Sequence, residues 1–204
     1  VFDGPSVPIL IEPLAGVDVV TPTPDLLAEN STDPQGDDLT YSFEVYDSAS
    51  LVNLVASISG EPEDISGQTG WKVDVPLIEN TLYWWRAAAN DGIIDSPWSD
   101  PETFFVNEIE EAPPTPTPLY PVDGEVLALP LTEAFFEWSD VEDPEGDVVT
   151  YQIRLWDEAM TVQLDEAFTD GVVEARGEWI ITTGLVENTW YVWDIAAADE
   201  LGTV

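Results

Sequence analysis

Two stretches decide the fold of this chain: residues 33–46, DPQGDDLTYSFEVY, and residues 143–156, DPEGDVVTYQIRLW. Each joins an Asp-Pro-x-Gly-Asp turn to a run in which apolar and polar side chains alternate. Such alternation predicts a strand with one buried face. The side chains that we expect to face the core are the alternate ones: Tyr41, Phe43, Val45, Tyr151, Ile153 and Leu155.

The rest of the chain repeats with nearly the same spacing. Residues 79–85, ENTLYWW, return 108 positions later at 187–193 as ENTWYVW. Shorter matches keep the same order: 13–16 with 121–124, Trp71 with Trp179, and 88–91 with 196–199. Ordered matches of this kind indicate two domains of about 100 residues each. We place domain 1 at residues 1–107, an acidic Pro-rich linker at 108–118 and domain 2 at 119–204.

Further runs of period two complete the pattern in domain 1. Trp71, Val73 and Val75 are expected to face one way, and so are Tyr83, Trp85, Ala87 and Ala89. Residues 103–106 form an expected last strand, and no stretch has a convincing helical period. Short strands separated by turn residues predict an all-β fold of two tandem sandwiches.

Both halves resemble fibronectin type III domains, in particular bacterial secreted members of that family. The resemblance covers nearly the whole chain. It rests on the Asp-Pro-x-Gly-Asp-x-x-Thr-Tyr and Asn-Thr-x-Tyr-x-Trp patterns and on Trp98-Ser99 before the last strand. It implies two fibronectin type III or immunoglobulin-like β-sandwiches, with Tyr83 and Tyr191 in tyrosine-corner positions.

Domain 2 departs from this pattern near its end. The counterpart of residues 98–106 is missing before Val204. We therefore expect an open sheet edge, through truncation, through disorder or because another chain donates the strand.

The amino-acid composition excludes several classes of function. The chain has 42 acidic and 4 basic residues, for a formal net charge of −38, and no Cys or His. Nucleic acid and anionic membrane surfaces would repel it. No stretch is apolar for long enough to insert into a membrane. The absence of Cys excludes thiol chemistry. The absence of both Cys and His leaves only oxygen ligands for a metal site, and such a site favours Ca²⁺. The acidity reflects either such sites or adaptation to high salt.

The acidic loops are candidate calcium sites and are similar to the calcium-rich loops of cadherin-like bacterial repeats. In the resembled fold, the loop between the second and third strands lies at the same pole as the loop after the sixth. The candidate ligands are Asp140, Glu142, Asp143, Asp147 and Asp199 in domain 2, and Asp33, Asp37, Asp38 and Asp91 in domain 1. In the competing interpretation Asp only caps the turn, while Pro fixes φ and Gly adopts a positive φ.

Outward-facing aromatic residues are a second candidate site. They are Tyr46, Trp84 and Trp98, with Arg86, in domain 1, and Trp156 and Trp190 in domain 2. A flat aromatic platform could bind a glycan by stacking. Alternatively, Arg86 stacks between Trp84 and Trp98 as a surface ladder that stabilises the fold.

The sequence contains no nucleophile elbow, no phosphate-binding loop and no His, so we do not expect an enzyme. We expect an extracellular structural or adhesion module, secreted or at a bacterial cell surface: a calcium-stabilised rigid spacer whose partners are neighbouring domains of the same polypeptide. Two alternatives remain open. The first is a carbohydrate- or protein-binding accessory module of a secreted enzyme, and the second is a filament subunit completed by strand exchange.

Overall fold

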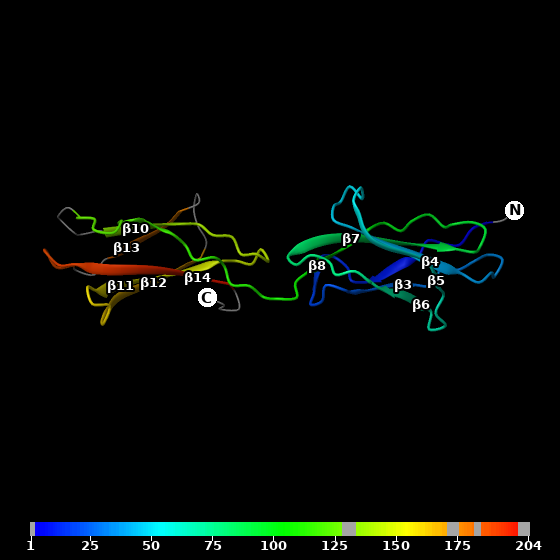
Figure 1. The fold of residues 1–204 in the computed structure, drawn as a ribbon, viewed down its shortest axis with the longest axis horizontal. Helices are drawn as coiled ribbons and strands as arrows, with labels where there is room; N and C mark the ends of the chain where they lie inside the picture. Colours follow the sequence, from blue (N-terminus) through cyan, green and yellow to red (C-terminus); the bar gives the residue numbers. More distant parts are fainter. Residues whose placement is uncertain (1–2, 128–133, 171–175, 182–184, 200–204) are drawn as a thin grey trace. The chain divides into compact units, whose positions relative to one another are not determined.

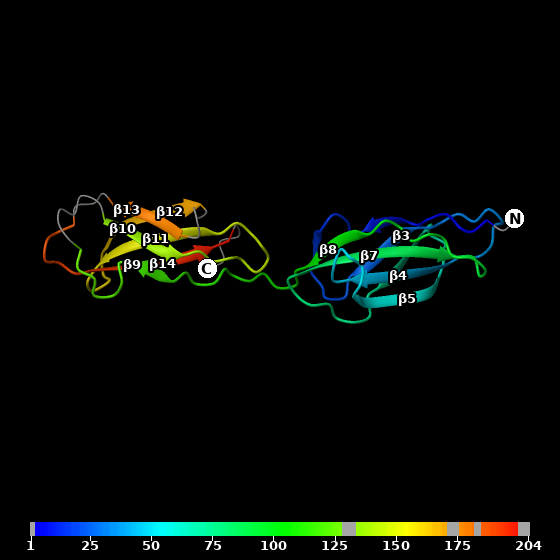
Figure 2. The same ribbon diagram turned by 90° about the horizontal axis from the view of Figure 1, so that it is seen from above.

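The computed structural model describes residues 3–127, 134–170, 176–181 and 185–199, and every regular element in these ranges is a β-strand (Figures 1 and 2). The chain divides into two compact units, Val1–Ile109 and Glu110–Val204, which are called domain 1 and domain 2 below. Within the described ranges, no helix could span a membrane. The predicted all-β fold class is confirmed, because each unit is a sandwich of two β-sheets.

Domain 1 consists of two sheets. The first has the order β1-β3-β6, formed by Ile9–Glu12, Asp25–Glu29 and Gln68–Lys72. The second has the order β2-β8-β7-β4-β5, formed by Val17–Val19, Glu102–Val106, Thr81–Asn90, Thr40–Tyr46 and Leu54–Pro62. Every pairing is antiparallel except that of β2 with β8, which is parallel.

The core of domain 1 lies between these sheets and contains all the predicted inward residues except Val75. Tyr41, Phe43 and Val45 are buried on β4, and the Phe43 ring lies 6.4 Å from Trp71 and 6.3 Å from Trp85 between ring centroids. Burial of each large apolar side chain contributes roughly 1.5–3 kcal/mol. The predicted inward orientation of Val75 is wrong, because β6 ends at Lys72 and the bend that follows leaves Val75 42% exposed.

Domain 2 has six strands within its described residues. One sheet has the order β13-β10-β9, formed by Arg176–Ile181, Ala134–Ser139 and Pro118–Tyr120. The other has the order β12-β11-β14, formed by Gln163–Asp170, Thr150–Asp157 and Tyr191–Ala198. The predicted inward residues of β11, namely Tyr151, Ile153 and Leu155, are buried. The expected open end at Val204 lies outside the described residues.

The tyrosine corners that the resemblance implied are present in both domains. The Tyr83 hydroxyl accepts a hydrogen bond from the Ile78 N–H at 2.9 Å, and the Tyr191 hydroxyl accepts one from Val186 at 2.7 Å. In each domain this bond holds the chain just before the long strand, β7 or β14. The two domains therefore use the same device to position that strand.

A tryptophan two residues further on ties this strand to the start of the domain. Trp85 Nε1 donates to the Pro13 carbonyl at 2.8 Å, and Trp193 Nε1 donates to the Pro121 carbonyl at 3.1 Å. Because each bond joins residues 72 positions apart in sequence, it connects the long strand to a segment near the start of the domain. The repeated Asn-Thr-x-Tyr-x-Trp pattern thus encodes two of the contacts that hold the sandwich together.

Candidate functional site

The acidic loop of domain 1 is a turn closed by its first aspartate. Asp33 Oδ1 accepts hydrogen bonds from the N–H groups of Gln35 at 2.8 Å and Asp37 at 3.1 Å. Gly36 adopts a φ of +77°, which favours glycine. The Asp37 and Asp38 side chains are exposed. The geometry is that of an Asp-capped turn.

The acidic loop of domain 2 has the same geometry around Asp143. Its Oδ1 accepts hydrogen bonds from the N–H groups of Glu145 at 3.0 Å and Asp147 at 3.3 Å, and Gly146 has a φ of +85°. Asp143 is only 6% exposed, and its Oδ2 is buried with no hydrogen-bond partner among the described residues. The turn therefore uses one carboxylate oxygen of Asp143 and leaves the other oxygen inside the loop.

Four of the five predicted ligands in domain 2 line one hollow of about 390 Å³, which we call the acidic hollow. They are Asp140, Glu142, Asp143 and Asp147. Tyr151 forms part of the wall, and its hydroxyl donates to Asp140 Oδ1 at 2.5 Å. Burial, together with this hydrogen bond, raises the pKa of Tyr151 to about 12.

The fifth predicted ligand, Asp199, lies at the same end of the sandwich. Thr150 at the start of β11 is paired with Ala198 at the end of β14, so the residue after Ala198 lies beside the loop that precedes β11. Asp199 is 4% exposed. In domain 1, Asp91 follows β7 in the same way, and its Oδ1 accepts hydrogen bonds from the next turn, including one from Ile94 N at 2.7 Å. These hydrogen bonds lower the pKa of Asp91.

Glu145 is a functional candidate that the sequence reasoning missed. Burial, with the carboxyl groups of Glu111 and Asp143 beside it, raises the pKa of Glu145 to about 7. The only sequence signal is that Glu145 stands where the domain 1 loop has Gln35. Glu111 and Asp143 are therefore both neighbours of Glu145 in domain 2.

The structure places the acidic residues together without forming a metal centre. Over the described ranges, no three acidic side chains are close enough to one another to form a metal-binding group. In both loops the first aspartate accepts hydrogen bonds from backbone N–H groups of the same loop, and these bonds close the turn. Calcium binding thus stays a prediction, and its best location is the domain 2 loop.

The aromatic ladder of domain 1 centres on Arg86. Its guanidinium lies 4.5 Å from the ring centroid of Trp98 and 5.3 Å from that of Tyr46, and it forms a 2.7 Å ion pair with Glu44. The predicted stacking against Trp84 is wrong in this detail, because Tyr46 takes that place: its hydroxyl accepts a 3.0 Å hydrogen bond from Arg86. The group is a cation–π ladder across the sheet surface.

Domain 2 has a similar cross-strand group with the charges exchanged. Arg154 on β11 pairs with Asp194 on β14 at 2.7 Å, whereas in domain 1 the arginine is on the second of the two strands. The Arg154 guanidinium lies 5.5 Å from the Trp156 ring centroid, and Trp156 Nε1 donates to Asp194 at 3.1 Å. Trp190 is 56% exposed.

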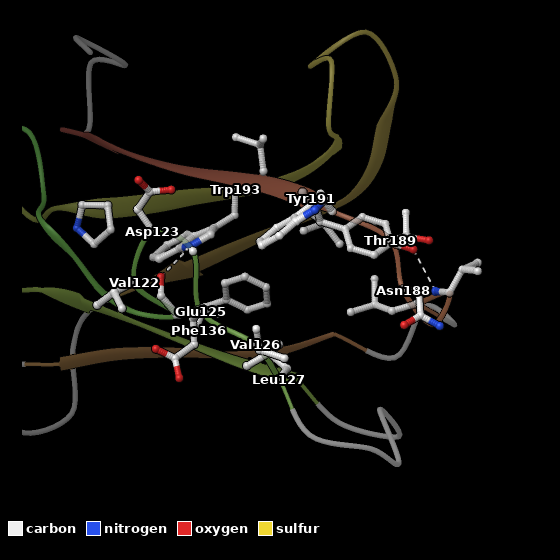
Figure 3. Close-up of a pocket in the computed structure, with 18 of the residues that line it drawn as sticks. Val122, Asp123, Glu125, Val126, Leu127, Phe136, Asn188, Thr189, Tyr191 and Trp193 are labelled. Atoms are coloured by element: carbon white, nitrogen blue, oxygen red, sulfur yellow. Dashed lines mark hydrogen bonds between the residues drawn. The ribbon is translucent and has the colours of Figure 1, made fainter.

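A second cavity of domain 2, of about 930 Å³, lies along the first half of β14; we call it the groove (Figure 3). The rings of Tyr191 and Trp193 project from β14 into it and face Phe136, with segment 122–127 alongside (Figure 3). The Phe136 and Trp193 rings meet edge to face at 5.0 Å. No motif in the sequence indicated this groove.

Comparison with known proteins gives a fold likeness only. No protein-family model and no curated protein sequence matches this chain. Among solved structures, the chain is similar to the FN1–FN3 domains of chicken CNTN1, at 18% sequence identity and a TM-score of 0.33. The match covers 97% of this chain and 64% of the chicken chain, so the chain spans less than two thirds of that structure.

Proposed function

We propose that this chain is a non-enzymatic structural or adhesion module that acts outside the cell as part of a repeat array. One observation carries the proposal: the residues that the two domains share hold the sandwich together. They include the tyrosine corners, the Trp–Pro hydrogen bonds and the Asp-capped turns. A repeat that preserves its framework in this way is suited to spacing or displaying other parts of a polypeptide.

The dimensions of a domain suit a spacer. The ten residues of β7 span about 33 Å at a rise of about 3.3 Å per residue. The net charge of −38 keeps such a surface soluble and repels anionic partners. Neighbouring domains of the same polypeptide are the partners that this function requires.

Calcium is the second part of the proposal, and it is assigned to domain 2. The donor chemistry fits a hard cation: Asp143 Oδ2 and both Oε atoms of Glu145 are buried, and the carboxyl groups of Glu111 and Asp143 lie beside Glu145. These three residues, with Asp140 and others of the acidic hollow, would hold the ion. Bound calcium would relieve the repulsion between the carboxylates and fix the loop at the start of β11.

Thermal unfolding tests the calcium proposal. The whole chain is melted in EDTA and then in about 1 mM Ca²⁺ at constant high NaCl, so that general screening does not change. A hundredfold excess of calcium over its Kd adds about 2.7 kcal/mol of stability, which raises the Tm of a domain of this size by roughly 10 °C or more.

Two variants that each remove one negative charge control this experiment. Asp143→Ala should abolish the calcium-dependent rise in Tm, whereas Glu158→Ala, an exposed residue of the turn after β11, should preserve it. An equal calcium response in both variants would show that calcium acts on the general charge and not at this loop.

A binding module is the second candidate function, and the exposure of Trp190 favours it. A 56%-exposed tryptophan offers a stacking surface for a glycan or an anchor for a protein partner. Electrophoresis in gels that contain soluble polysaccharide tests the first option. Retardation that Trp190→Ala removes would support glycan binding, and mobility equal to that of an inert marker protein would exclude it for the polysaccharides used.

A further inference from the structure

The acidic Pro-rich segment between the two domains is bound at its start by domain 1. The Asn107 N–H group donates to the Val19 carbonyl at 3.0 Å, directly after the last paired residues of β2 and β8. The next two N–H groups, at 108 and 109, both donate to Oε1 of Glu79, at 2.7 and 3.0 Å. Domain 1 therefore holds three successive N–H groups after β8.

The backbone on both sides of Glu79 is itself fixed. The N–H group of Ile78 donates to the Tyr83 hydroxyl at 2.9 Å, and the N–H group of Asn80 donates to the Val106 carbonyl at 2.9 Å. Glu79 is partly buried between them. Because its neighbours are held by the tyrosine corner and by the end of β8, its carboxylate is already placed to accept the two N–H groups.

The later part of the segment is bound within domain 2. Pro113 and Pro116 are buried. The Thr117 N–H group donates to Ser139 Oγ at 2.8 Å, and the Thr117 carbonyl accepts from the Ser139 N–H group at 2.9 Å. The carboxyl group of Glu111 lies beside that of Glu145 in the acidic loop. Contacts with domain 2 thus begin at residue 111.

Domain 1 begins with a segment of the same kind. Pro5 and Pro8 stand 108 positions before the two buried prolines described above, and both are buried. Ser6 lies between them and forms two hydrogen bonds of 2.9 Å with Thr32, one from its N–H group to the Thr32 carbonyl and one from the Thr32 N–H group to its Oγ. The spacing of 108 is also that of the Glu-Asn-Thr motif. Residues 111–118 therefore correspond to the packed start of a domain.

We propose that the connection between the domains bends only at residues 109–111, and that Glu79 is the positioning residue that sets this limit. Domain 1 holds the chain up to the N–H group of residue 109, and domain 2 holds it from the side chain of residue 111. The proposal deepens the spacer function and rests on it for its purpose, because a spacer needs short joints. The contacts that support it require neither calcium nor a ligand.

Backbone ¹⁵N relaxation of the whole chain tests the proposal. The amides of residues 108, 109 and 117 should have order parameters near those of β7, about 0.85, as expected for a rigid backbone. In Glu79→Ala, the amides of 108 and 109 should fall below about 0.6, while those of β7 stay unchanged. Glu187→Ala is the matched control, because it removes the same side chain from the same motif of domain 2, and it should leave 108 and 109 ordered.

A conservative variant and a protease separate the hydrogen bonds from the charge. Glu79→Gln removes the charge but keeps an oxygen that accepts both N–H groups, so it should preserve the order of 108 and 109 better than Glu79→Ala. A glutamate-specific protease should cut after Glu108 at least about tenfold faster in Glu79→Ala than in the unaltered chain, because release of the two N–H groups exposes this bond. Glu187→Ala should not change that rate.

Three results would overturn the proposal: order parameters below about 0.6 throughout residues 108–117 of the unaltered chain, ordered 108 and 109 in Glu79→Ala, or an equal loss of order in Glu187→Ala. If Glu79→Ala does not fold, the unaltered chain and Glu79→Gln still decide the question. The outcome is independent of the calcium test. A Tm that does not respond to calcium would remove the calcium-stabilised spacer and leave the short joint, whereas a disordered segment would remove the joint and leave the calcium response.

Discussion

Each domain has a cross-strand ion pair, with the acidic residue on the earlier strand in domain 1 and the arginine on the earlier strand in domain 2. We therefore predict that domain 1 tolerates the arrangement found in domain 2. Glu44 and Arg86 face each other on β4 and β7, as Arg154 and Asp194 do on β11 and β14. We consider Glu44→Arg, Arg86→Glu and the double variant that carries both. The double variant places the charges of domain 1 in the order found in domain 2.

The contacts of Arg86 determine the expected magnitudes. Arg86→Glu removes two cation–π contacts of about 0.5–1 kcal/mol each and an ion pair of up to about 1 kcal/mol, and it sets two carboxylates face to face. We expect a loss of about 2–4 kcal/mol. Glu44→Arg keeps the stacking but opposes two guanidinium groups, so it should cost about 1–2 kcal/mol.

The double variant should be more stable than Arg86→Glu alone. It restores the ion pair and places an arginine two residues before Tyr46, as Arg154 stands two residues before Trp156. Only the contact with Trp98 is lost, so the net cost should be about 0.5–1 kcal/mol. Because the single losses sum to about 3–6 kcal/mol, the double-mutant cycle should give a coupling of roughly 2 kcal/mol or more.

Urea unfolding of the whole chain measures these free energies, and hydrogen exchange at β4 and β7 assigns the affected transition to domain 1. The same exchange in domain 2, Arg154→Asp with Asp194→Arg, is the matched control and should also show positive coupling. Raising the NaCl concentration should reduce the coupling, since both pairs are partly exposed. Additive losses in the double variant would refute the reasoning, because the ion pair would then have no influence on stability.

Three further predictions concern single residues. The pKa of Glu145 is about 7 in the folded chain and near 4.5 when unfolded, so in EDTA its contribution to stability should be present below pH 4.5 and lost as the pH rises through 7. This loss should be about 1–2 kcal/mol after solvent screening, and Glu145→Gln should remove it. Measuring the Tm of both proteins from pH 5 to 8 tests this prediction. Tyr83→Phe should cost about 1–3 kcal/mol in chemical denaturation, because it leaves a backbone N–H without its partner under a buried ring. Tyr191→Phe should cost less than about 1 kcal/mol, because water can reach the partly exposed ring, and equal costs of the two substitutions would contradict the reasoning. Gly70→Ala should lower the Tm measurably, because the added Cβ would lie 3.0 Å from the Leu26 carbonyl oxygen in the paired strand, and an unchanged Tm would show that the two strands separate easily.

The fold could be predicted from the sequence because its signals are local and repeated. Alternation fixed the buried face of β4 and β11, and the second copy of each motif excluded a chance pattern. Val75 was predicted wrongly because alternation continues past Lys72, whereas the strand ends there. Local pattern does not report where a neighbouring strand stops pairing.

The candidate sites were only partly predictable. The sequence indicated that Tyr46, Trp84 and Trp98 share a face with Arg86 and that Arg86 stacks between the two tryptophans. In the structure Arg86 lies over Trp98 and Tyr46, because Tyr46 on the paired strand accepts its hydrogen bond across the sheet. The sequence also named the acidic loops, but it could not tell that Glu145 would lie against Glu111, 34 residues away. The calcium ligands remain predictions.

The sequence alone determined that this chain forms two β-sandwiches of one design, which residues fill their cores, and that its surface is strongly acidic. Tertiary structure alone decided which distant residues meet. It brought the carboxyl groups of Glu111 and Glu145 together, set Arg86 against Glu44 and Arg154 against Asp194, and arranged Gly124, Glu187 and Asn188 around a groove. The physical reason is that a core depends on the periodicity within each strand, whereas a site depends on the register between strands and on loops that close over long separations in sequence.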